Sequence, residues 1–178
     1  MTDPDLIARA IASGDRDAFG ELVRRHQSDV RRYLRHLVAG DHARADDLAQ
    51  DTFLQAFRGL GRFQGGSTVK TWLMGIAHNL WRNDRRRLRP VPLDEAGPER
   101  IDPGPTPAEA GALGHDVAQA IRRLSPDEQQ AVHLAYHQGL SHGEIAAVTG
   151  WPLGTVKTHL TRAKDQLRTH LSPWQTPR

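Results

Sequence analysis

The chain has 178 residues, of which 38% are hydrophobic and 25% are charged, as in ordinary water-soluble globular proteins. No apolar run approaches the roughly 20 residues that cross a bilayer, and the acidic first residues lack the apolar core of a secretory signal, so neither membrane insertion nor secretion is expected. The absence of cysteine excludes disulfides and thiolate metal sites and favours a reducing, cytoplasmic setting.

The net charge of +3 is unevenly distributed along the chain. Residues 61–90 carry seven Lys/Arg and one Asp/Glu, and residues 121–178 carry seven and four, whereas residues 91–120 carry one and six. Basic segments are the usual electrostatic footprint of a nucleic-acid-binding protein. A solvated charged surface also produces single basic runs, so charge alone leaves both interpretations open.

The first 87 residues repeat their apolar side chains with the helical period of about 3.6 residues, and no segment alternates as a half-buried strand would. Helices are predicted over residues 5–12, from Asp15 or Asp17 to Gly40, and over residues 43–59 and 71–87. The last two helices are each expected to bury one side, formed by Leu48, Ala49, Phe53, Ala56, Phe57 and Leu60 and by Leu73, Ile76, Ala77 and Leu80.

A proline-rich stretch interrupts the helical pattern. Six of the eleven prolines fall between Pro90 and Pro107, where missing backbone donors and fixed φ angles oppose both helices and central strands. We interpret residues 88–112 as an extended acidic linker between a module of residues 1–87 and a module of residues 113–171, followed by a tail of residues 172–178. Two modules tied in this way can contact well-separated places on one partner.

The second module is also predicted to be helical, over residues 114–124, 126–138, 141–149 and 153–171. Two of these helices have clear start signals. Ser125 precedes Pro126, as an N-cap precedes a proline in the first helical position, and Ser141 is followed three residues later by Glu144, as in a capping box. The sequence therefore predicts an all-α protein with two small helical modules.

Residues 140–167 have the pattern of a helix-turn-helix. The first helix turns Ile145, Ala146 and Val148 inward, and Gly150 suits a left-handed turn before Pro152 begins the second helix. The second helix has a buried stripe of Val156, Leu160, Ala163 and Leu167 and an outer face of Lys157, Thr158, Thr161, Arg162, Asp165 and Arg168. An ordinary surface hairpin of helices shows a similar stripe, so the pattern alone is weak evidence.

The complete string GLSHGEIAAVTGWPLGTVKTHLTRAKDQL is more specific than this pattern. It resembles the last DNA-binding region of bacterial RNA polymerase sigma factors, which recognises the −35 promoter element. Arginine pairs with guanine in the major groove, threonine contacts bases or thymine methyl groups, and a residue at a helix start meets phosphate. The resemblance implies double-stranded −35 DNA contacts by Thr155, Lys157, Thr158, His159, Thr161, Arg162 and Lys164.

The string DDLAQDTFLQAFRGLGRFQGGSTVKTWLMGIAHNLWRNDRRR, residues 46–87, is similar to the sigma region that binds polymerase and the −10 element. The two resemblances cover about residues 19–87 and 113–171 with only the linker between them, which is the layout of the extracytoplasmic-function (ECF) group. They imply that single-stranded −10 DNA, with one base flipped into the loop, meets Phe63, Gly65, Gly66, Ser67, Thr68, Trp72, Asn79, Arg82, Asn83 and Arg86.

A polar face on the predicted helix of residues 43–59 is formed by Asp47, Gln50, Asp51 and Leu54. Such a face is more often merely solvated, but the resemblance implies that it docks on the coiled coil of the largest subunit of core RNA polymerase. Three positions depart from the family pattern: Val69 replaces a frequent aromatic, Gly66 a polar residue and His159 an arginine. These departures affect which promoter sequence is expected, and not the function.

Two other classes of function compete with this prediction. His133, His137 and His142 have spacing that suits a metal, but no HExxH glutamate or cysteine accompanies them, and no P-loop, dinucleotide or GxSxG motif occurs, so no catalytic residue, metal or cofactor is expected. A helix-turn-helix regulator that binds duplex operators without joining polymerase is the alternative. A receiver-type regulator, however, would have a βαβ pattern where the first 90 residues are helical.

The sequence therefore predicts a sigma factor that binds core RNA polymerase, recognises the −35 and −10 elements and assists melting, while polymerase performs the chemistry. The resemblance also implies that the acidic linker threads between the sites of the two modules, through the RNA exit channel, where its charge would mimic nucleic acid. Many members of the resembled family are held inactive by an anti-sigma factor, which makes such a factor a candidate partner.

Overall fold

The computed structural model describes residues 1–88 and 116–171, and every regular element in these two ranges is a helix. The elements are α1 (Asp3–Ser13), α2 (Arg16–Leu37), α3 (His42–Gly59), η1 (Leu60–Arg62), α4 (Val69–Leu88), α6 (Pro126–Val132), η3 (His133–His137), α7 (His142–Thr149) and α8 (Leu153–His170). A helix of residues 116–122 opens the second range. The predicted all-α fold is confirmed here. Leu88, predicted as the first residue of the linker, is instead the last residue of α4, and the rest of the predicted linker and the tail lie outside the described residues.

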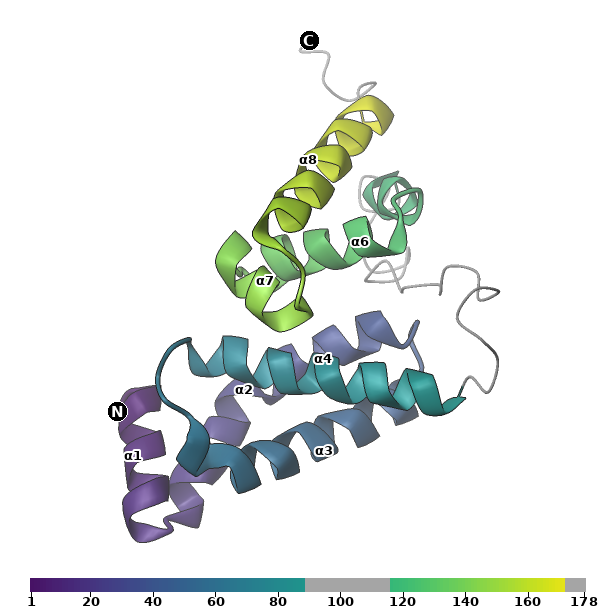
Figure 1. Cartoon of the computed structure of the whole chain (residues 1–178). Coiled ribbons are helices and arrows are strands. Elements are labelled where there is room, and N and C mark those ends of the chain that lie inside the picture. The colour runs from purple at the N-terminus through teal and green to yellow at the C-terminus, as the bar shows by residue number, and fades with distance from the viewer. Residues whose placement is uncertain (89–115, 172–178) are drawn as a thin grey trace. The chain divides into compact units, whose positions relative to one another are not determined.

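In the first module, α2, α3 and α4 pack against one another and α1 packs against α2 (Figure 1). The largest side chains at the centre are Tyr33, Leu34 and Leu37 from α2 and Met74 from α4, all completely buried. Burying such side chains stabilises the fold by roughly 1.5–3 kcal/mol each, so this core stabilises the module.

Short polar side chains set where the first helices begin and end. Thr2 and Asp5 form a capping box at the start of α1, and Gly14 ends this helix with a left-handed φ of 62°. Asp15 then caps α2 by accepting hydrogen bonds from the backbone N–H groups of Asp17 and Ala18, so that of the two predicted caps the first is used. Such caps are worth about 1 kcal/mol each.

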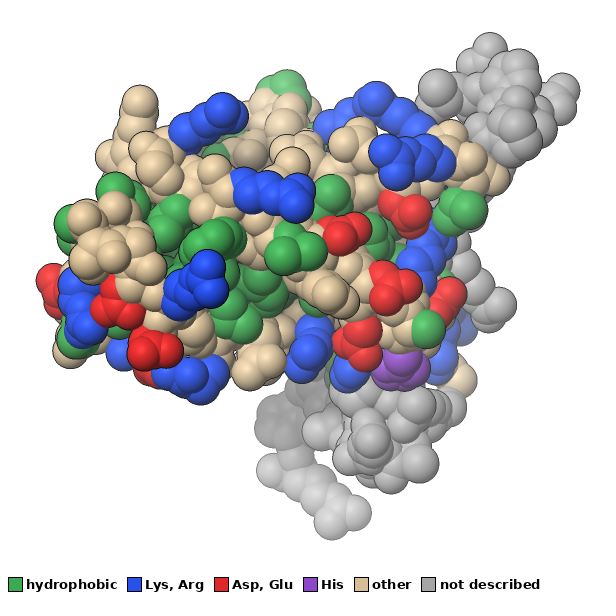
Figure 2. All heavy atoms as spheres, turned by 90° about the horizontal axis from the view of Figure 1, so that it is seen from below, with side chains coloured by type: hydrophobic (Ala, Val, Ile, Leu, Met, Phe, Trp, Pro, Cys, Tyr) green, Lys and Arg blue, Asp and Glu red, His purple; other side chains and the backbone are tan. Residues whose placement is uncertain are grey.

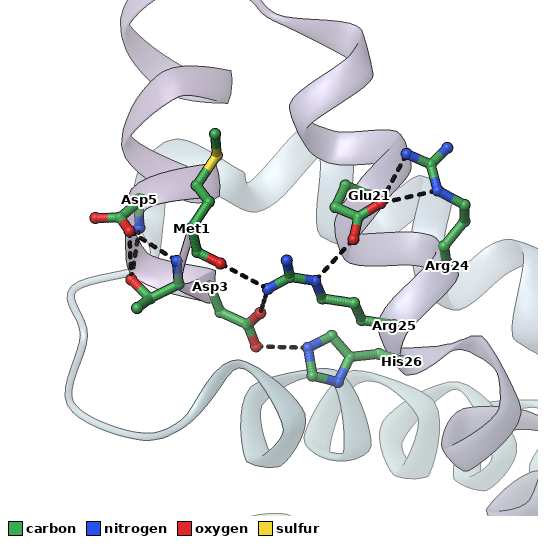
Figure 3. Close-up of polar contacts among 8 residues, drawn as sticks. Met1, Asp3, Asp5, Glu21, Arg24, Arg25 and His26 are labelled. Carbon is green, nitrogen blue, oxygen red and sulfur yellow. Dashed lines mark hydrogen bonds and ion pairs between the residues drawn. The ribbon is translucent and has the colours of Figure 1, made fainter.

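Charged side chains tie α1 to α2 along their exposed edge (Figure 3). Asp3 accepts a hydrogen bond from Arg25 Nη1 at 3.0 Å and lies 2.7 Å from His26 Nε2, while Glu21 accepts from Arg25 Nε at 2.9 Å. Hydrogen bonds from Arg25 and Arg24 hold the pKa of Glu21 below its ordinary value. Because these groups are solvated, the pairs fix the orientation of α1 more than they stabilise the module.

Two sequence predictions about buried faces are wrong in part. On α4, Leu73 and Ala77 are buried as expected, but Ile76 and Leu80 are only half-buried. The stripe is instead completed by Val69, Thr71, Met74, His78 and Trp81. The helix is rotated relative to the prediction because α2 offers His78 a buried polar partner, which an apolar period cannot reveal.

The prediction for α3 is wrong at Phe57. The sequence pattern predicts that this side chain is buried, but 48% of it is exposed, and Thr52 occupies a fully buried position on α3 instead. The hydroxyl of Thr52 donates to the carbonyl of Leu48 at 2.7 Å, so this polar side chain is satisfied within its own helix.

In the second module, α6 packs against α8. Ser125 with Glu128 and Ser141 with Glu144 form the predicted capping boxes, and Gly150 has the predicted left-handed conformation with a φ of 76°. The helix predicted over residues 126–138 changes to π-helical winding at His133–His137. The core is formed by Leu134, Ile145, Val148, Val156, Leu160 and Ala163. Leu167, expected in the buried stripe of α8, is half-buried.

None of the described helices combines the length and the apolar character that crossing a bilayer requires.

A buried histidine joins α2 to α4. His78 is 3% exposed, its Nδ1 lies 3.0 Å from the hydroxyl of Tyr33, and its ring lies 5.3 Å from that of Trp81. Burial, with a smaller contribution from the charge of Arg82, lowers the pKa of His78 from 6.5 to about 4. The folded state therefore holds this imidazole neutral, whereas the unfolded chain leaves it free to take up a proton near pH 6.5.

This difference makes the stability of the first module depend on pH. The contribution of His78 is complete above its unfolded pKa of 6.5 and is lost as pH falls toward its folded pKa of about 4. We expect the free energy of unfolding to fall by about 2–3 kcal/mol between pH 7 and pH 4.5, a window above the ordinary pKa of most carboxylates. Denaturant unfolding of wild type and His78→Gln across this window measures it. The variant should show a flatter profile, and equal slopes for the two proteins would contradict the assignment.

Candidate nucleic-acid and protein interfaces

The second helix of the helix-turn-helix, α8, presents an exposed row of polar and basic side chains. Its first turn has no side-chain cap, because Pro152 occupies the N-cap position. Seven side chains are predicted to contact duplex DNA. Five of them are exposed, namely Lys157, Thr158, Thr161, Arg162 and Lys164. The other two, Thr155 and His159, are half-buried. None of the three cations forms an ion pair within the described residues, so their charge is available to a phosphate or a base.

Two of these α8 residues already have intramolecular contacts. The hydroxyl of Thr158 donates to the carbonyl of Gly154 at 2.9 Å, which leaves its methyl group and its lone pairs for a partner. The ring of His159 packs against that of Trp151, from the turn before α8, with 5.0 Å between ring centroids. The sequence did not draw attention to Trp151, since its spacing of eight residues from His159 gives no periodic signal across a turn.

The loop before α4 combines small residues with an aromatic wall. Gly65 adopts a left-handed φ of 72°, and Gly66 is exposed. Phe63, at one end of the loop, packs on Trp72 of α4 with 5.0 Å between ring centroids. Thr68 accepts a hydrogen bond from the backbone N–H of Thr71 at 3.1 Å and so caps α4. Stacking on such aromatic rings stabilises an unstacked base by about 1–3 kcal/mol.

The polar residues predicted on α4 all lie on the surface. Four of them are exposed: Asn79, Arg82, Asn83 and Arg86. The last three follow Asn79 by three, four and seven residues, so all four lie on one side of the helix, C-terminal to Trp72. Three consecutive arginines, Arg85, Arg86 and Arg87, lie in the last turn of α4 and differ in their surroundings. Arg85 lies over the ring of Trp81, 5.5 Å from its centroid, whereas Arg86 and Arg87 are exposed.

A groove of about 470 Å³ runs between α2 and α3. Asp47, Gln50 and Leu54 line it, as the predicted polymerase-binding face would, and Asp51 is exposed next to them. Its apolar walls are formed by Phe19, Val23, Ala49, Phe53 and Phe57. Phe19 and Phe57 meet edge to face with 5.0 Å between centroids. In Figure 2, apolar side chains gather in the left half of the view of the face that bears α3, with charged side chains around them.

The sequence predicts Leu54 on this face but places Phe57 in the core. Leu54 is 46% exposed and Phe57 is 48% exposed, and the two side chains lie three residues apart on one face of α3. The spacing of Gln50, Leu54 and Phe57 places all three on one side of the helix and so indicates that Phe57 belongs to the groove. Phe57 also fits the periodic pattern of the buried side chains, however, so the sequence allows both placements.

The histidines of the second module do not converge on a common point. His133 and His137 stack with 5.0 Å between ring centroids, and His133 Nε2 lies 3.3 Å from Gln138 Nε2. No group of three or more His, Cys, Asp or Glu side chains with metal-binding geometry occurs in residues 1–88 and 116–171.

Comparison with known proteins places these features in a family. Residues 22–90 match the family described as Sigma-70 region 2, and residues 115–167 match Sigma-70, region 4. The chain therefore belongs to the sigma-70 family of RNA polymerase sigma factors. Within that family it falls in the ECF group, because it is 33% identical to the ECF RNA polymerase sigma factor SigC of Mycobacterium tuberculosis over 94% of this chain and 90% of that protein. It is 32% identical to the ECF RNA polymerase sigma-E factor of Salmonella typhimurium over 97% and 96% of the two chains.

Solved structures of two similar proteins contain a partner. One is CnrH in complex with the cytosolic domain of CnrY, which is 27% identical with a TM-score of 0.67 over 96% of this chain and 97% of that one. The other is the sigma factor RpoE in complex with the anti-sigma factor NepR from Bartonella quintana, which is 29% identical with a TM-score of 0.67 over 86% and 96%.

The loop before α4 offers a matched pair of substitutions. A Cβ added at Gly65 or at Gly66 meets no atom within 4 Å, but only Gly65 has a positive φ. We expect Gly65→Ala to lower the free energy of unfolding by about 1 kcal/mol through backbone strain, and Gly66→Ala to leave it nearly unchanged. Chemical denaturation measures both. Equal losses in the two variants would show that the left-handed turn is not what requires glycine here.

Proposed function

We propose that this sigma factor is the promoter-specificity subunit of RNA polymerase, in which the first module binds core enzyme and −10 DNA and the second binds the −35 duplex. The observation that carries the proposal is the presence of both sigma regions, in order, in one chain. A helix-turn-helix alone would suit a regulator of duplex operators, but the α4 surface and the groove between α2 and α3 would then have no use. We take residues 1–87 and 113–171 as the two functional modules.

In the second module, α8 enters the major groove of the −35 element with its N-terminal half against the bases. Arg162, exposed and without an ion pair among the described residues, offers a bidentate fork to guanine, and Thr158 and Thr161 lie on the same outer face. Lys157 and Lys164 lie to one side of this face, where they suit phosphate contacts.

In the first module, single-stranded −10 DNA follows α4 and the loop before it. Gly65, Gly66, Ser67 and Thr68 allow close approach of a flipped base, beside the ring pair of Phe63 and Trp72. Asn79 and Asn83 offer paired donors and acceptors to base edges, and Arg82 and Arg86 offer charge to the phosphates. Stabilising one unpaired strand in this way assists melting.

The groove between α2 and α3 receives the coiled coil of the largest subunit of core polymerase. Its apolar walls provide buried contact area, and the acidic and amide side chains of Asp47, Gln50 and Asp51 rim it. An apolar centre with a polar rim is typical of a reversible protein interface. An anti-sigma factor is a further candidate partner, since two similar structures contain a partner chain and one of these partners is named an anti-sigma factor.

In this assignment the chain catalyses no reaction and needs no cofactor, because polymerase performs the chemistry. It acts in the cytoplasm, where polymerase and promoter DNA are found. Transcription reconstituted from the full chain and core polymerase on genomic DNA, with sequencing of the transcript starts, tests the proposal. Starts that share −35 and −10 elements and depend on the chain are expected. Binding to duplex DNA without any new start would instead favour the operator-binding regulator.

The acidic rim of the groove provides a prediction about polymerase binding. Reversing both charges with Asp47→Lys and Asp51→Lys should weaken association with core polymerase at least tenfold, because both carboxylates are exposed and unpaired among the described residues. Gln55→Lys, an exposed position on α3 that does not line the groove, is the control and should bind normally. Affinity is measured by titrating labelled protein with core enzyme. Normal binding by the folded double variant would rule out this face.

The two modules should also differ in how their arginines act. Arg162→Ala should cost roughly 1–3 kcal/mol on the preferred −35 sequence and relax base choice at one position. Arg86→Ala should weaken binding to all sequences alike and lower the salt slope by roughly one unit. Binding of promoter variants by each mutant holoenzyme across a salt series separates the two roles. A uniform loss for Arg162→Ala together with altered sequence preference for Arg86→Ala would reverse the assignment.

A further inference from the structure

Trp151 and His159 form a contact that the assignment above leaves without a role. Trp151 lies in the turn of the helix-turn-helix and His159 in the second turn of α8, and their rings lie 5.0 Å apart at 52°. Both side chains are half-buried, in an element whose other polar side chains are mostly exposed. The indole is itself constrained, because a residue before proline is held in extended backbone conformations and Pro152 follows it.

The packing leaves only one ring nitrogen of His159 open to a partner. Nδ1 is buried and has no hydrogen-bond partner among the described residues, whereas Nε2 is not buried in this way. A proton on Nδ1 would be a buried donor without an acceptor, which is costly. The burial of Nδ1 therefore favours the tautomer with its proton on Nε2, which presents one N–H donor outward.

The position of His159 on α8 indicates what this donor meets. Successive helical residues are about 100° apart, so His159 lies roughly 60° from the buried Val156, whereas Thr158 lies roughly 160° away. Thr158 thus points to the floor of the groove that α8 would occupy, and His159 points to its wall. The wall of a major groove is the sugar–phosphate backbone, which offers acceptors only.

We propose that Trp151 positions the His159 imidazole so that its Nε2–H donates one hydrogen bond to a phosphate oxygen of duplex DNA beside α8. This inference rests on the proposed function in that α8 binds the −35 duplex. His159 contacts the DNA, and Trp151 is a positioning residue that acts through it. The pair fixes how deeply α8 sits in the groove without adding charge or reading a base.

The test uses the whole chain of 178 residues and two probes. The chain alone is titrated with a short duplex of random sequence, and the holoenzyme is titrated with a promoter fragment and its −35 variants. Measurements across a salt series at about pH 8 keep imidazoles in general neutral. His159→Ala should weaken binding to both probes about tenfold, as expected for one lost hydrogen bond to a charged group. The salt slope should not change, because a neutral donor displaces no counterion. His42→Ala, an exposed histidine of α3, is the control and should bind the random duplex normally.

Four further single variants and one double variant separate positioning from simple packing. His159→Gln keeps an N–H donor and should retain most of the affinity, while His159→Arg should raise the salt slope by about one. Trp151→Ala should weaken binding as much as His159→Ala, and the double variant should be no worse than either, because the two residues act as one unit. Trp151→Phe keeps an aromatic ring beside His159 and should retain binding. If Trp151→Ala does not fold, the affinity of Trp151→Phe for DNA is the measurement that tests the ring contact.

The outcomes that overturn the inference are distinct from failure of the proposed function. A shift in base preference at one −35 position in His159→Ala would make His159 a base reader. A salt slope that falls by one would make it a charged contact. Additive losses for Trp151→Ala and His159→Ala would remove the positioning role. A different result would contradict the proposed function alone. In that case the wild-type chain binds the random duplex and the variants change this binding as expected, but the holoenzyme shows no preference for promoter sequences.

Discussion

The packing of α2 against both α3 and α4 is the interaction on which the surfaces of the first module depend. Tyr33, Leu34 and Leu37 are completely buried there, and Tyr33 reaches His78 on α4. This contact sets the rotation of α4 about its own axis, and therefore which of its side chains face solvent. With His78 and Trp81 turned inward, Asn79, Arg82 and Arg86 are turned outward. A polar contact in the core thus decides which residues are presented to the DNA.

The other side of α2 has the opposite property. Where it meets α3, the apolar side chains are not fully covered, and Phe19, Phe53 and Phe57 remain accessible as the walls of a groove. Three helices cannot bury all sides of each, so a small bundle leaves apolar surface that either destabilises it in solution or serves a partner. Here exposed acidic side chains lie along the rim of that surface.

Local signals explain most of what could be predicted from the sequence. Asp15, Ser125, Ser141 and Gly150 act within one turn of the backbone that they cap or reverse, so their neighbours in sequence suffice to recognise them. The misplaced residues depend on distant partners. His78 is buried where it contacts Tyr33, which lies 45 positions earlier in the chain. Phe57 lies at the surface, where its ring packs against that of Phe19. The resemblance to sigma factors predicts the contact surfaces on α3, α4 and α8. The aromatic side chains that pack beside these surfaces can be identified only from the folded structure.

The π-helical turn at His133–His137 bears on how this protein can vary in length. Its defining bond runs from the N–H of Gln138 to the carbonyl of His133 at 3.1 Å, spanning one more residue than an α-helical bond. Loss of one residue from this turn would restore ordinary winding, while the capping boxes at Ser125 and Ser141 would still start their helices independently. We therefore expect a single-residue deletion within 133–137 to destabilise the second module less than a deletion within α8, which would rotate every later side chain by about 100° and destroy the register of its outer face.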